Sequence, residues 1–537
     1  MRIKLACGLI GVLAACSIAA AQSAQVKQHP IPKIVKENGR YALMVDGAPF
    51  LILGAQANNS STWPATLPKV WSAIEYLHAN TLEIPIYWEQ FEPQPGRFDY
   101  SVMDTVITQA RQHNVRLVLL WFGTWKNGSQ HYMPEWMKLE PEKYFHVIGK
   151  DGTPVDSPSP FCTAAQELDI RAFTAFMRHL KAVDPQRTVL MVQVENEPGT
   201  WGALRDYSPA AQKLFEAPVP EAVLKAMGKQ SGTPVNWQEA FGPEAEVCFH
   251  AWAVASYIEK VAAAGKAVYP LPMYANAALR DPFKGAPGSY ESGGPTDNVL
   301  PIWKVAAPSL DVLAPDIYLP GTAEYLKVLE LYHRDDNPLF VPETMGSEAA
   351  SRFFFSALGL QAIGYSPFGL DYVEARAFDP GGDGAHSPED RLKPTARNYE
   401  LVGPMMRDVA RLNFEGKLQA VAEVEGKPAE TLSFGAWNAE VSYGGFRNMP
   451  ARGNPQPIGR VLVAQLKDNQ FLVAGYHCRV DFSPAAAGKR RQFLRVEEGV
   501  YENGRFKFLR ILNGDQTDWG LNFGSEPKVL RVSVATY

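Results

Sequence analysis

The sequence predicts a (β/α)8 barrel followed by an all-β domain, and two patterns lead to this prediction. In the first three quarters of the chain, short apolar runs alternate with segments whose apolar residues recur at helical spacing. Beyond Asn413 the chain instead carries alternating apolar and polar segments, separated by Gly, Asp and Asn turns. We therefore expect the barrel over residues 25–410 and a sandwich-like all-β domain over residues 411–537.

The expected barrel strands are apolar runs that gain polar side chains only where they end. Such a run is typical of a parallel strand, because both of its faces are buried until it emerges from the barrel. A tight turn at Asp46 and Gly47 precedes the first strand. Apolar residues at helical spacing predict helices between the strands, for example over residues 245–265. The eight strands are expected at residues 50–57, 81–87, 116–128, 189–199, 272–276, 311–319, 338–346 and 362–370.

The composition excludes several classes of function. The net charge is −5 and no basic run occurs, which argues against nucleic acid as a partner. Part of the 12 Trp, 21 Tyr and 27 Phe could form sugar-stacking surfaces, although most of them are expected in the core. The sequence contains no phosphate loop, dinucleotide fingerprint or G-x-S-x-G motif. We therefore expect neither a cofactor nor a serine nucleophile, and no protein partner is evident.

The first two dozen residues are expected to direct export. Arg2 and Lys4 precede an apolar segment over residues 5–15, which is too short to span a membrane and suits a signal peptide over residues 1–24. Cleavage is expected at the small residues 19–21, whereas the competing lipobox-like sequence would leave Cys16 lipidated. The mature protein would then be periplasmic, or an outer-membrane lipoprotein held by a lipid anchor.

Three cysteines remain in the expected mature chain, at Cys162, Cys248 and Cys478. They can form at most one disulfide. They make no C-x-x-C motif and no Cys/His cluster, so neither a structural zinc nor another metal site is expected.

Two acidic residues stand at the ends of expected barrel strands. Glu197 ends the strand VLMVQVENEPG, and Glu343 ends PLFVPETMG. Catalytic residues of such barrels lie at the carboxyl ends of the strands, and a pair of carboxylates there is typical of a glycosidase. We expect Glu197 to be the general acid/base and Glu343 the nucleophile, with environments that push their pKa values apart.

Neighbouring residues suggest supporting roles. Asn196 is suited to bind the sugar 2-hydroxyl, and Tyr318, at the end of the sixth strand, to hydrogen-bond Glu343. Strand alternation would put Glu195 on the same side as Glu197 but deeper in the barrel, as a paired structural acid. Asn58 could contact sugar or form a helix-capping loop, and Glu92 could bind sugar or close its loop; Glu89 is expected to be structural.

Two stretches resemble glycoside hydrolase family 35, the β-galactosidases. QVENEPG matches the family's Q-x-E-N-E stretch, and YWEQFEPQPGRFDY matches its W-x-x-H-E-P-x-x-G motif at Trp88, Glu92 and Pro93. The resemblance covers the barrel, and the all-β tail is similar to that of a bacterial branch in which some members trim galactose from xyloglucan. It implies a retaining exo-β-galactosidase that acts on galactose-containing plant cell-wall oligosaccharides.

The galactose contacts of that family do not carry over. Pro85 stands where many members have a tyrosine, and residues 121–125 lack the acid of the family's Cys-Ala-Glu-Trp segment. The expected replacements are Trp125, Asn127, Trp201 and Tyr365.

Two other classes of function compete with this hypothesis. The first is another glycosidase of the same clan, such as a β-glucosidase, mannanase or endoglucanase, because loops rather than the barrel select the sugar. The second is a non-catalytic surface protein that binds sugar on a decayed barrel. The presence of both strand-end acids together with Asn196 and Tyr318 favours an enzyme.

Overall fold

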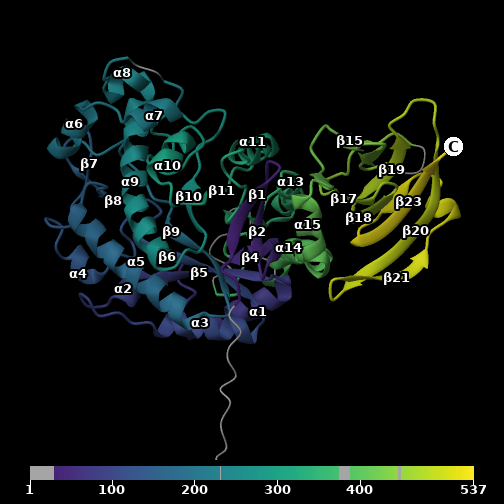
Figure 1. Ribbon diagram of the computed structural model, residues 1–537, viewed down its shortest axis with the longest axis horizontal. Coiled ribbons are helices and arrows are strands. Elements are labelled where there is room, and N and C mark those ends of the chain that lie inside the picture. The colour runs from purple at the N-terminus through teal and green to yellow at the C-terminus, as the bar shows by residue number, and fades with distance from the viewer. Residues whose placement is uncertain (1–28, 230–231, 374–387, 446–448) are drawn as a thin grey trace, which may run out of the picture.

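The computed structural model describes residues 29–229, 232–373, 388–445 and 449–537. It contains a barrel with surrounding helices and, beside it, an all-β unit that ends the chain (Figure 1). The expected signal peptide, including Cys16, lies outside the described residues. Within the described ranges, no helix combines the length and apolar character needed to cross a membrane.

Eight parallel strands form the barrel, in the order predicted from the sequence. The first and last strands pair with each other, and the ring closes between Val341 and Tyr365, where Val341 donates its N–H to Gly364 at 3.2 Å. Because the predicted runs are apolar throughout, both faces of these strands are buried. The strands are β4 (Ile52–Gln56), β5 (Thr81–Tyr87), β6 (Arg116–Lys126), β9 (Val189–Asn196), β10 (Met273–Ala278), β11 (Val312–Ile317), β12 (Glu343–Thr344) and β13 (Gly364–Tyr365).

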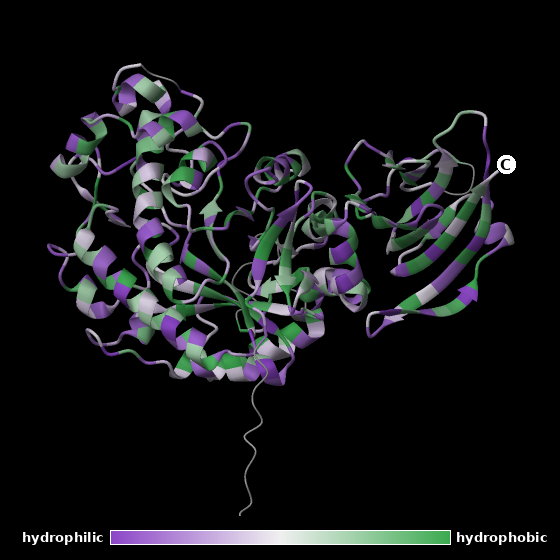
Figure 2. Ribbon diagram, viewed as in Figure 1, coloured by the Kyte–Doolittle hydropathy of each residue, from purple (hydrophilic) through white to green (hydrophobic). Residues whose placement is uncertain are grey.

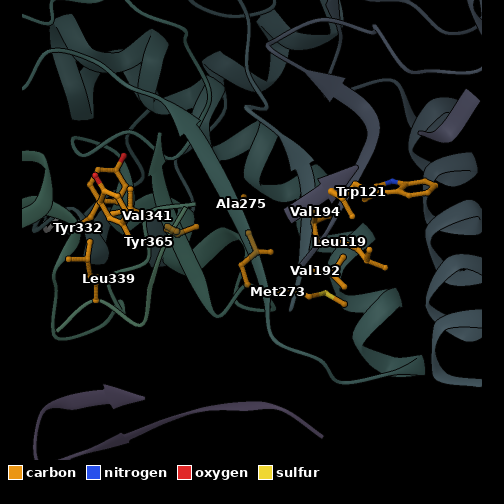
Figure 3. Close-up of a cluster of buried hydrophobic side chains, with 14 of the residues drawn as sticks. Leu119, Trp121, Val192, Val194, Met273, Ala275, Tyr332, Leu339, Val341 and Tyr365 are labelled. Atoms are coloured by element: carbon orange, nitrogen blue, oxygen red, sulfur yellow. The ribbon is translucent and has the colours of Figure 1, made fainter. Parts of the chain in front are cut away.

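Amphipathic helices cover the outside of the barrel. Helix α1 (Leu67–Leu77) shows the pattern: Leu67, Val70, Ile74 and Leu77 are spaced by three or four residues and are all buried. Figure 3 shows part of this layer, with Trp121 of β6 and Met273 of β10 in one apolar cluster. The other helices are α2 (Trp88–Phe91), α3 (Ser101–Gln112), α4 (Glu135–Lys138), α5 (Thr163–Val183), α6 (Pro209–Glu216), α7 (Glu221–Ala226), α8 (Trp237–Phe241), α9 (Ala245–Val268), α10 (Leu300–Ala306), α11 (Thr322–Tyr332), α12 (Glu348–Ser351), α13 (Phe353–Gly359), α14 (Pro388–Val402) and α15 (Met406–Phe414).

A small N-terminal sheet closes one end of the barrel. It consists of β1 (Lys33–Glu37), β2 (Arg40–Val45) and β3 (Ala48–Phe50). Asp46 and Gly47 form the predicted tight turn, with φ of 55° and 81° as such a hairpin requires. Leu43 and Val45 pack in the same apolar cluster as the inner side chains of the barrel strands, so the opposite end is left for the site. A separate two-stranded ribbon, β7 (His146–Ile148) and β8 (Pro154–Pro158), follows β6.

The C-terminal unit is a sandwich of two antiparallel sheets, as predicted. Apolar side chains from both sheets meet in one cluster, and along the strands apolar and polar residues alternate (Figure 2). One sheet has the order β14-β17-β18-β23-β20-β21 and the other β15-β16-β19-β22. The strands are β14 (Leu418–Ala422), β15 (Ala429–Phe434), β16 (Trp437–Ser442), β17 (Arg460–Lys467), β18 (Gln470–Tyr476), β19 (Cys478–Pro484), β20 (Arg491–Glu502), β21 (Arg505–Ile511), β22 (Leu521–Phe523) and β23 (Lys528–Thr536).

Candidate active site

Three carboxylates converge at the carboxyl end of the barrel strands. One oxygen each of Glu197, Asp316 and Glu343 lies within 4.8 Å of the others. Glu197 follows the last residue of β9, Asp316 lies near the end of β11, and Glu343 begins β12. The structure therefore brings together the two acids predicted as a pair and adds Asp316, which the sequence analysis did not single out.

Glu343 is held by two hydrogen bonds from different strands. Gln56 of β4 donates its side-chain amide to one carboxylate oxygen at 2.8 Å, and the Tyr318 hydroxyl donates to the other at 2.7 Å. The Tyr318 contact is the one expected from the sequence. Glu343 is 5% exposed, so the two donors fix its orientation in a largely desolvated place.

Beneath Glu343, the inside of the barrel carries another acid. Glu83 of β5 is fully buried and accepts a hydrogen bond from the Tyr274 hydroxyl at 3.0 Å. Burial raises the pKa of Glu83 to about 8, and the negative charge of Glu343 acts in the same direction. At neutral pH Glu83 is therefore mostly neutral and adds little negative charge beneath Glu343.

Glu197 stands in an environment that shifts its titration to near neutral pH. Burial raises its pKa to about 7, and the charge of Glu343 adds to this effect. The positive charge of Lys126 and a hydrogen bond with Asp316 act in the opposite direction. An acid with this pKa can donate a proton at neutral pH and take one back later in a reaction cycle.

The backbone of Glu197 is held in an unusual conformation. Its φ is 42°, in the left-handed region that non-glycine residues rarely adopt. Its N–H donates to the side-chain oxygen of Asn276 at 2.9 Å, and the amide of Asn276 donates to Asp316 at 2.5 Å. Asn276 thus couples the position of the Glu197 backbone to Asp316, a connection that the sequence analysis missed.

Asn196 is fully buried beside these acids. Neither its side-chain oxygen nor its nitrogen has a hydrogen-bond partner among the described residues. Buried amides are nearly always paired, so the unpaired side-chain amide of Asn196 needs an explanation. This placement fits the predicted contact with a sugar hydroxyl.

Two charged residues that the sequence analysis did not predict lie beside Glu197. Lys126, at the end of β6, is 3% exposed and donates to the side-chain oxygen of Asn127. Glu291, in the loop after β10, is 2% exposed; burial and the charge of Glu197 raise the pKa of Glu291, and the charge of Lys126 lowers it. Lys126 ends an apolar strand, and this position could have identified it as a residue of the site. The loop around Glu291 shows no periodic pattern that would identify Glu291.

Other predicted contacts lie at the edge of the site or outside it. The exposed Asn127 and the half-exposed Trp201 flank the loops that follow β6 and β9. Asn58 donates its amide to Asp371 at 2.8 Å and its backbone N–H to the same carboxylate at 2.9 Å. Of the two roles open for Asn58, the structure shows no helix cap, because Thr66 is the N-cap of α1; Asn58 instead ties its loop to Asp371, which already occupies its amide group.

Trp125 and Tyr365 are not in the site, which corrects two expectations. Trp125 is fully buried and packs edge-on against Tyr257 of α9, with ring centroids 4.7 Å apart. Tyr365 is buried in the apolar cluster shown in Figure 3, and its hydroxyl lies 2.8 Å from that of Tyr325 on α11. Both rings stabilise the contact between strands and helices. The prediction was wrong because a ring near a strand end can still point outward, toward the helices.

Glu92 is likewise a structural residue, not a sugar ligand. Its carboxylate is fully buried and accepts hydrogen bonds from the Trp88 indole at 2.9 Å and the Gly96 N–H at 2.6 Å. Arg171 of α5 forms an ion pair with it. All of these partners belong to the loop after β5 or to the helix layer, so Glu92 closes its loop.

Glu195 is a paired structural acid, but not inside the barrel. Its carboxylate accepts the N–H of Trp125 at 2.6 Å and hydrogen-bonds Asp169 of α5, so it faces the helix layer. Its φ of 64° breaks the strand alternation on which the expected position rested. Glu89 forms only a partly exposed ion pair with Lys138, in agreement with a structural role.

The three described cysteines are free and buried. Burial raises the pKa of the Cys248 thiol to about 12, and it also raises the pKa of the Cys162 thiol above its ordinary value. Neither thiol is therefore activated as a nucleophile.

Two family models match parts of the chain. Residues 61–259, which include Glu197, match the glycoside hydrolase family 42 model, described as "Beta-galactosidase". Residues 395–524 match a domain of unknown function, DUF5597. The barrel segment is thus similar to β-galactosidases, which supports a glycosidase, whereas the family 35 assignment is not confirmed. No curated protein matches the chain.

Several solved structures are similar in fold. The β-galactosidase of Bacillus circulans sp. alkalophilus has a TM-score of 0.51 at 10% identity, covering 90% of this chain and 99% of that one. The cold-adapted β-galactosidase of Rahnella sp. R3 has a TM-score of 0.43 at 17% identity, covering 60% of this chain. The present chain spans about half, 51%, of the Rahnella protein. At such identities the likeness concerns the fold alone.

Proposed function

We propose that the chain is a retaining exo-β-galactosidase that releases terminal β-D-galactosyl residues from plant cell-wall oligosaccharides such as xyloglucan fragments. The observation that carries the proposal is the close pair of Glu197 and Glu343, with oxygens within 4.8 Å. Retaining glycosidases hold their carboxyl groups about 5–5.5 Å apart, and inverting enzymes about 6.5–9.5 Å. The family 42 match supports galactose, and the motif resemblance to family 35 supports the xyloglucan branch.

The first half of the reaction forms a covalent intermediate. A carboxylate oxygen of Glu343 attacks the anomeric carbon while Glu197 gives its proton to the glycosidic oxygen, so the carbon–oxygen bond breaks and the leaving sugar departs as an alcohol. The hydrogen bonds from Tyr318 and Gln56 orient Glu343 for this attack. Asn196 binds a hydroxyl of the reacting sugar in this proposal, which its unpaired side-chain amide supports.

The second half of the reaction returns the enzyme to its starting state. Glu197, now ionised, takes a proton from water, and the resulting hydroxide attacks the anomeric carbon and releases Glu343. Two displacements on opposite faces retain the configuration of the sugar. A pKa of about 7 suits Glu197 to both steps, since it loses and regains its proton near neutral pH.

We also propose export of the chain, which rests on residues 1–24 alone. Mass spectrometry of the protein recovered from cell fractions tests this point. Cleavage after residues 19–21 gives a periplasmic protein, and a diacylated Cys16 gives a membrane-bound one. A chain that keeps Met1 and stays in the cytoplasm would contradict export.

The sugar assignment is tested by hydrolysis of nitrophenyl β-galactoside, β-glucoside and β-mannoside. The expected result is that kcat/KM is highest for the galactoside, and that galactosylated xyloglucan oligosaccharides release free galactose. A higher kcat/KM for glucoside or mannoside would overturn the galactose assignment but not the mechanism. Failure to cleave any of the three would overturn the proposed function.

A further inference from the structure

Glu291 is a buried carboxylate that the mechanism above does not use. It is 2% exposed, and neither of its oxygens forms a hydrogen bond of ordinary geometry with any described residue, although the Trp201 indole lies close enough to lower the pKa of its carboxyl group. Burial raises the pKa of Glu291 well above its ordinary value, which favours the neutral carboxyl group. A buried carboxyl group without a well-formed hydrogen bond still needs an explanation. Carboxylates accept hydrogen bonds through two oxygens, which suits them to bind neighbouring hydroxyls of a sugar.

The backbone around Glu291 leaves room for its carboxylate. A Cβ on Gly128, whose φ is 68°, would lie 2.2 Å from an oxygen of Glu291. A Cβ on Gly199 would lie 2.8 Å from the same oxygen. Glycines in the two loops that follow β6 and β9 therefore let the carboxylate sit directly against the segment that carries Glu197.

Trp201 lies opposite Glu291 across a short backbone pairing. Thr200 donates its N–H to Ser292 at 2.7 Å and accepts one from it at 3.1 Å. Because the two segments run antiparallel, Trp201, which follows Thr200, lies across from Glu291, which precedes Ser292. The Trp201 indole is 51% exposed and also approaches Gly128. An exposed ring beside a buried acceptor is typical of a sugar subsite.

The position of Glu291 relative to the two catalytic acids indicates which sugar it meets. The Glu291 carboxyl group lies against Gly128 and Gly199, and Gly128 donates its N–H to the backbone oxygen of Glu197 at 3.0 Å. Glu291 thus lies on the side of the acid/base. In a retaining glycosidase the nucleophile faces the anomeric carbon and the acid/base faces the leaving oxygen.

We propose that Glu291 and Trp201 form the subsite for the leaving sugar, with the Trp201 ring stacked on that sugar and the Glu291 carboxylate accepting hydrogen bonds from two of its hydroxyls. This inference rests on the proposed function and specifies its substrate: a galactoside whose leaving group is itself a sugar. It also gives a reason for the half-exposed indole, which packs on no ring in the described part of the protein.

The test compares two substrates that share the galactosyl group and differ in the leaving group: a β-galactosyl disaccharide and β-galactosyl fluoride. We expect Glu291→Gln and Trp201→Ala to lower kcat/KM for the disaccharide about tenfold or more beyond any loss with the fluoride. The loss of a hydrogen bond accounts for a change of roughly this size. Fluoride has no hydroxyl and no ring, so it does not use the subsite.

Matched controls separate a binding role from a structural one. Both controls lie in the sandwich: Glu423→Gln removes an equally buried carboxylate, and Trp519→Ala removes a similarly exposed indole. Neither variant should alter the ratio of kcat/KM for the disaccharide to kcat/KM for the fluoride. Equal losses with both substrates, or no loss, would overturn the inference. Because Trp201 is exposed, its variant should fold even if Glu291→Gln does not. If the wild type cleaves neither substrate, the proposed function fails instead.

Discussion

Left-handed backbone conformations at two residues of one strand end shape the candidate site. Glu195 and Glu197 have φ of 64° and 42°, and Asn196 lies between them. These conformations turn Glu195 toward α5 while Glu197 joins Glu343 and Asp316. Such strain costs about 1–3 kcal/mol per residue and persists only where the surroundings hold it. Here the hydrogen bonds of Trp125 to Glu195 and of Glu197 to Asn276 provide that support.

The raised pKa of Glu197 predicts the pH dependence of the reaction. The general acid must be protonated, and its protonated fraction falls as the pH rises through about 7. We therefore expect kcat/KM to decrease above pH 7. Lys126→Met removes a positive charge that lowers this pKa, so the decrease should move to higher pH.

The measurement is a pH profile of kcat/KM, which reports the free enzyme. Lys138→Met serves as the control, because Lys138 pairs with the partly exposed Glu89 and not with the site. A profile of Lys126→Met that is unchanged, or displaced to lower pH, would contradict the assignment of Glu197 as the acid.

At the residue scale, the sequence predicted the groups with a strong local signal. Glu197 and Glu343 each follow a long apolar run, so their position at the barrel opening could be predicted from periodicity. The direction in which Trp125 and Tyr365 point could not, because it depends on packing against helices distant in sequence. Glu291 lies in a loop without periodicity, and only the fold brings it to Glu197.

At the scale of elements, buried polar contacts join strand β6 to its helices. Asp169 of α5 accepts hydrogen bonds from the Trp121 indole at 2.9 Å and the Thr124 hydroxyl at 2.7 Å, both on β6. Thr124 also lies 2.9 Å from the Tyr257 hydroxyl of α9. Burial raises the pKa of Asp169 and that of the adjacent Glu195, and the hydrogen bond between them raises the pKa of Glu195 further.

Replacing Asp169 should therefore destabilise the barrel, by an amount that depends on how many hydrogen-bond acceptors the new side chain keeps. Asp169→Ala leaves two buried donors without an acceptor, and we expect the free energy of unfolding to fall by about 2–5 kcal/mol. Asp169→Asn keeps the shape and one acceptor oxygen, so its loss should be less than half as large. Urea denaturation followed by tryptophan fluorescence measures both.

The control for this comparison is Asp104→Ala, because Asp104 is half exposed and pairs only with His179 on the surface. Its effect should be below about 1 kcal/mol, as for other surface pairs. If Asp169→Ala were as mild as this control, the polar contacts would not be what joins β6 to α5.

The strands were easier to predict than their lengths. All eight predicted runs overlap an observed barrel strand, since a parallel strand buried on both faces is apolar along its length. The fifth run, predicted over residues 272–276, ends two residues too early, because β10 continues to Ala278. The seventh, expected over residues 338–346, is regular only at Glu343–Thr344, and Val341 supplies a single bridge to β13. The length of this strand depends on its hydrogen bonds to β13, where the barrel closes. The pattern of apolar residues in the sequence does not show these partners.

At the scale of the whole molecule, the sandwich is docked on the barrel through buried contacts. Arg460 of β17 is fully buried, donates to Glu348 at 2.6 Å and Ser351 at 2.9 Å on α12, and stacks over Tyr476. Nearby, a Cβ on Gly359 at the end of α13 would lie 2.1 Å from the backbone oxygen of Ala420. The two parts of the chain therefore share a close interface, seen beside α13 and α15 in Figure 1.

Arg460→Ala should weaken this docking. It removes both hydrogen bonds to α12 and leaves a hole beside Tyr476, so we expect a loss of about 2–4 kcal/mol in the stability of the interface. Calorimetry should show a lower first transition, and limited proteolysis should cut faster between the barrel and β14. Arg495→Ala, at an exposed pair with Glu497, should behave as the wild type. An unchanged first transition would contradict a role for Arg460 in docking.

The most direct test of the central claim is to trap the covalent intermediate. A 2-deoxy-2-fluoro-β-galactosyl fluoride forms the glycosyl-enzyme but slows its hydrolysis, because the fluorine destabilises the charged transition state. Mass spectrometry of the digested protein should find one fluorogalactosyl group, attached to Glu343. A label on any other residue, or continued turnover of natural galactosides by Glu343→Ala, would contradict the double displacement described here.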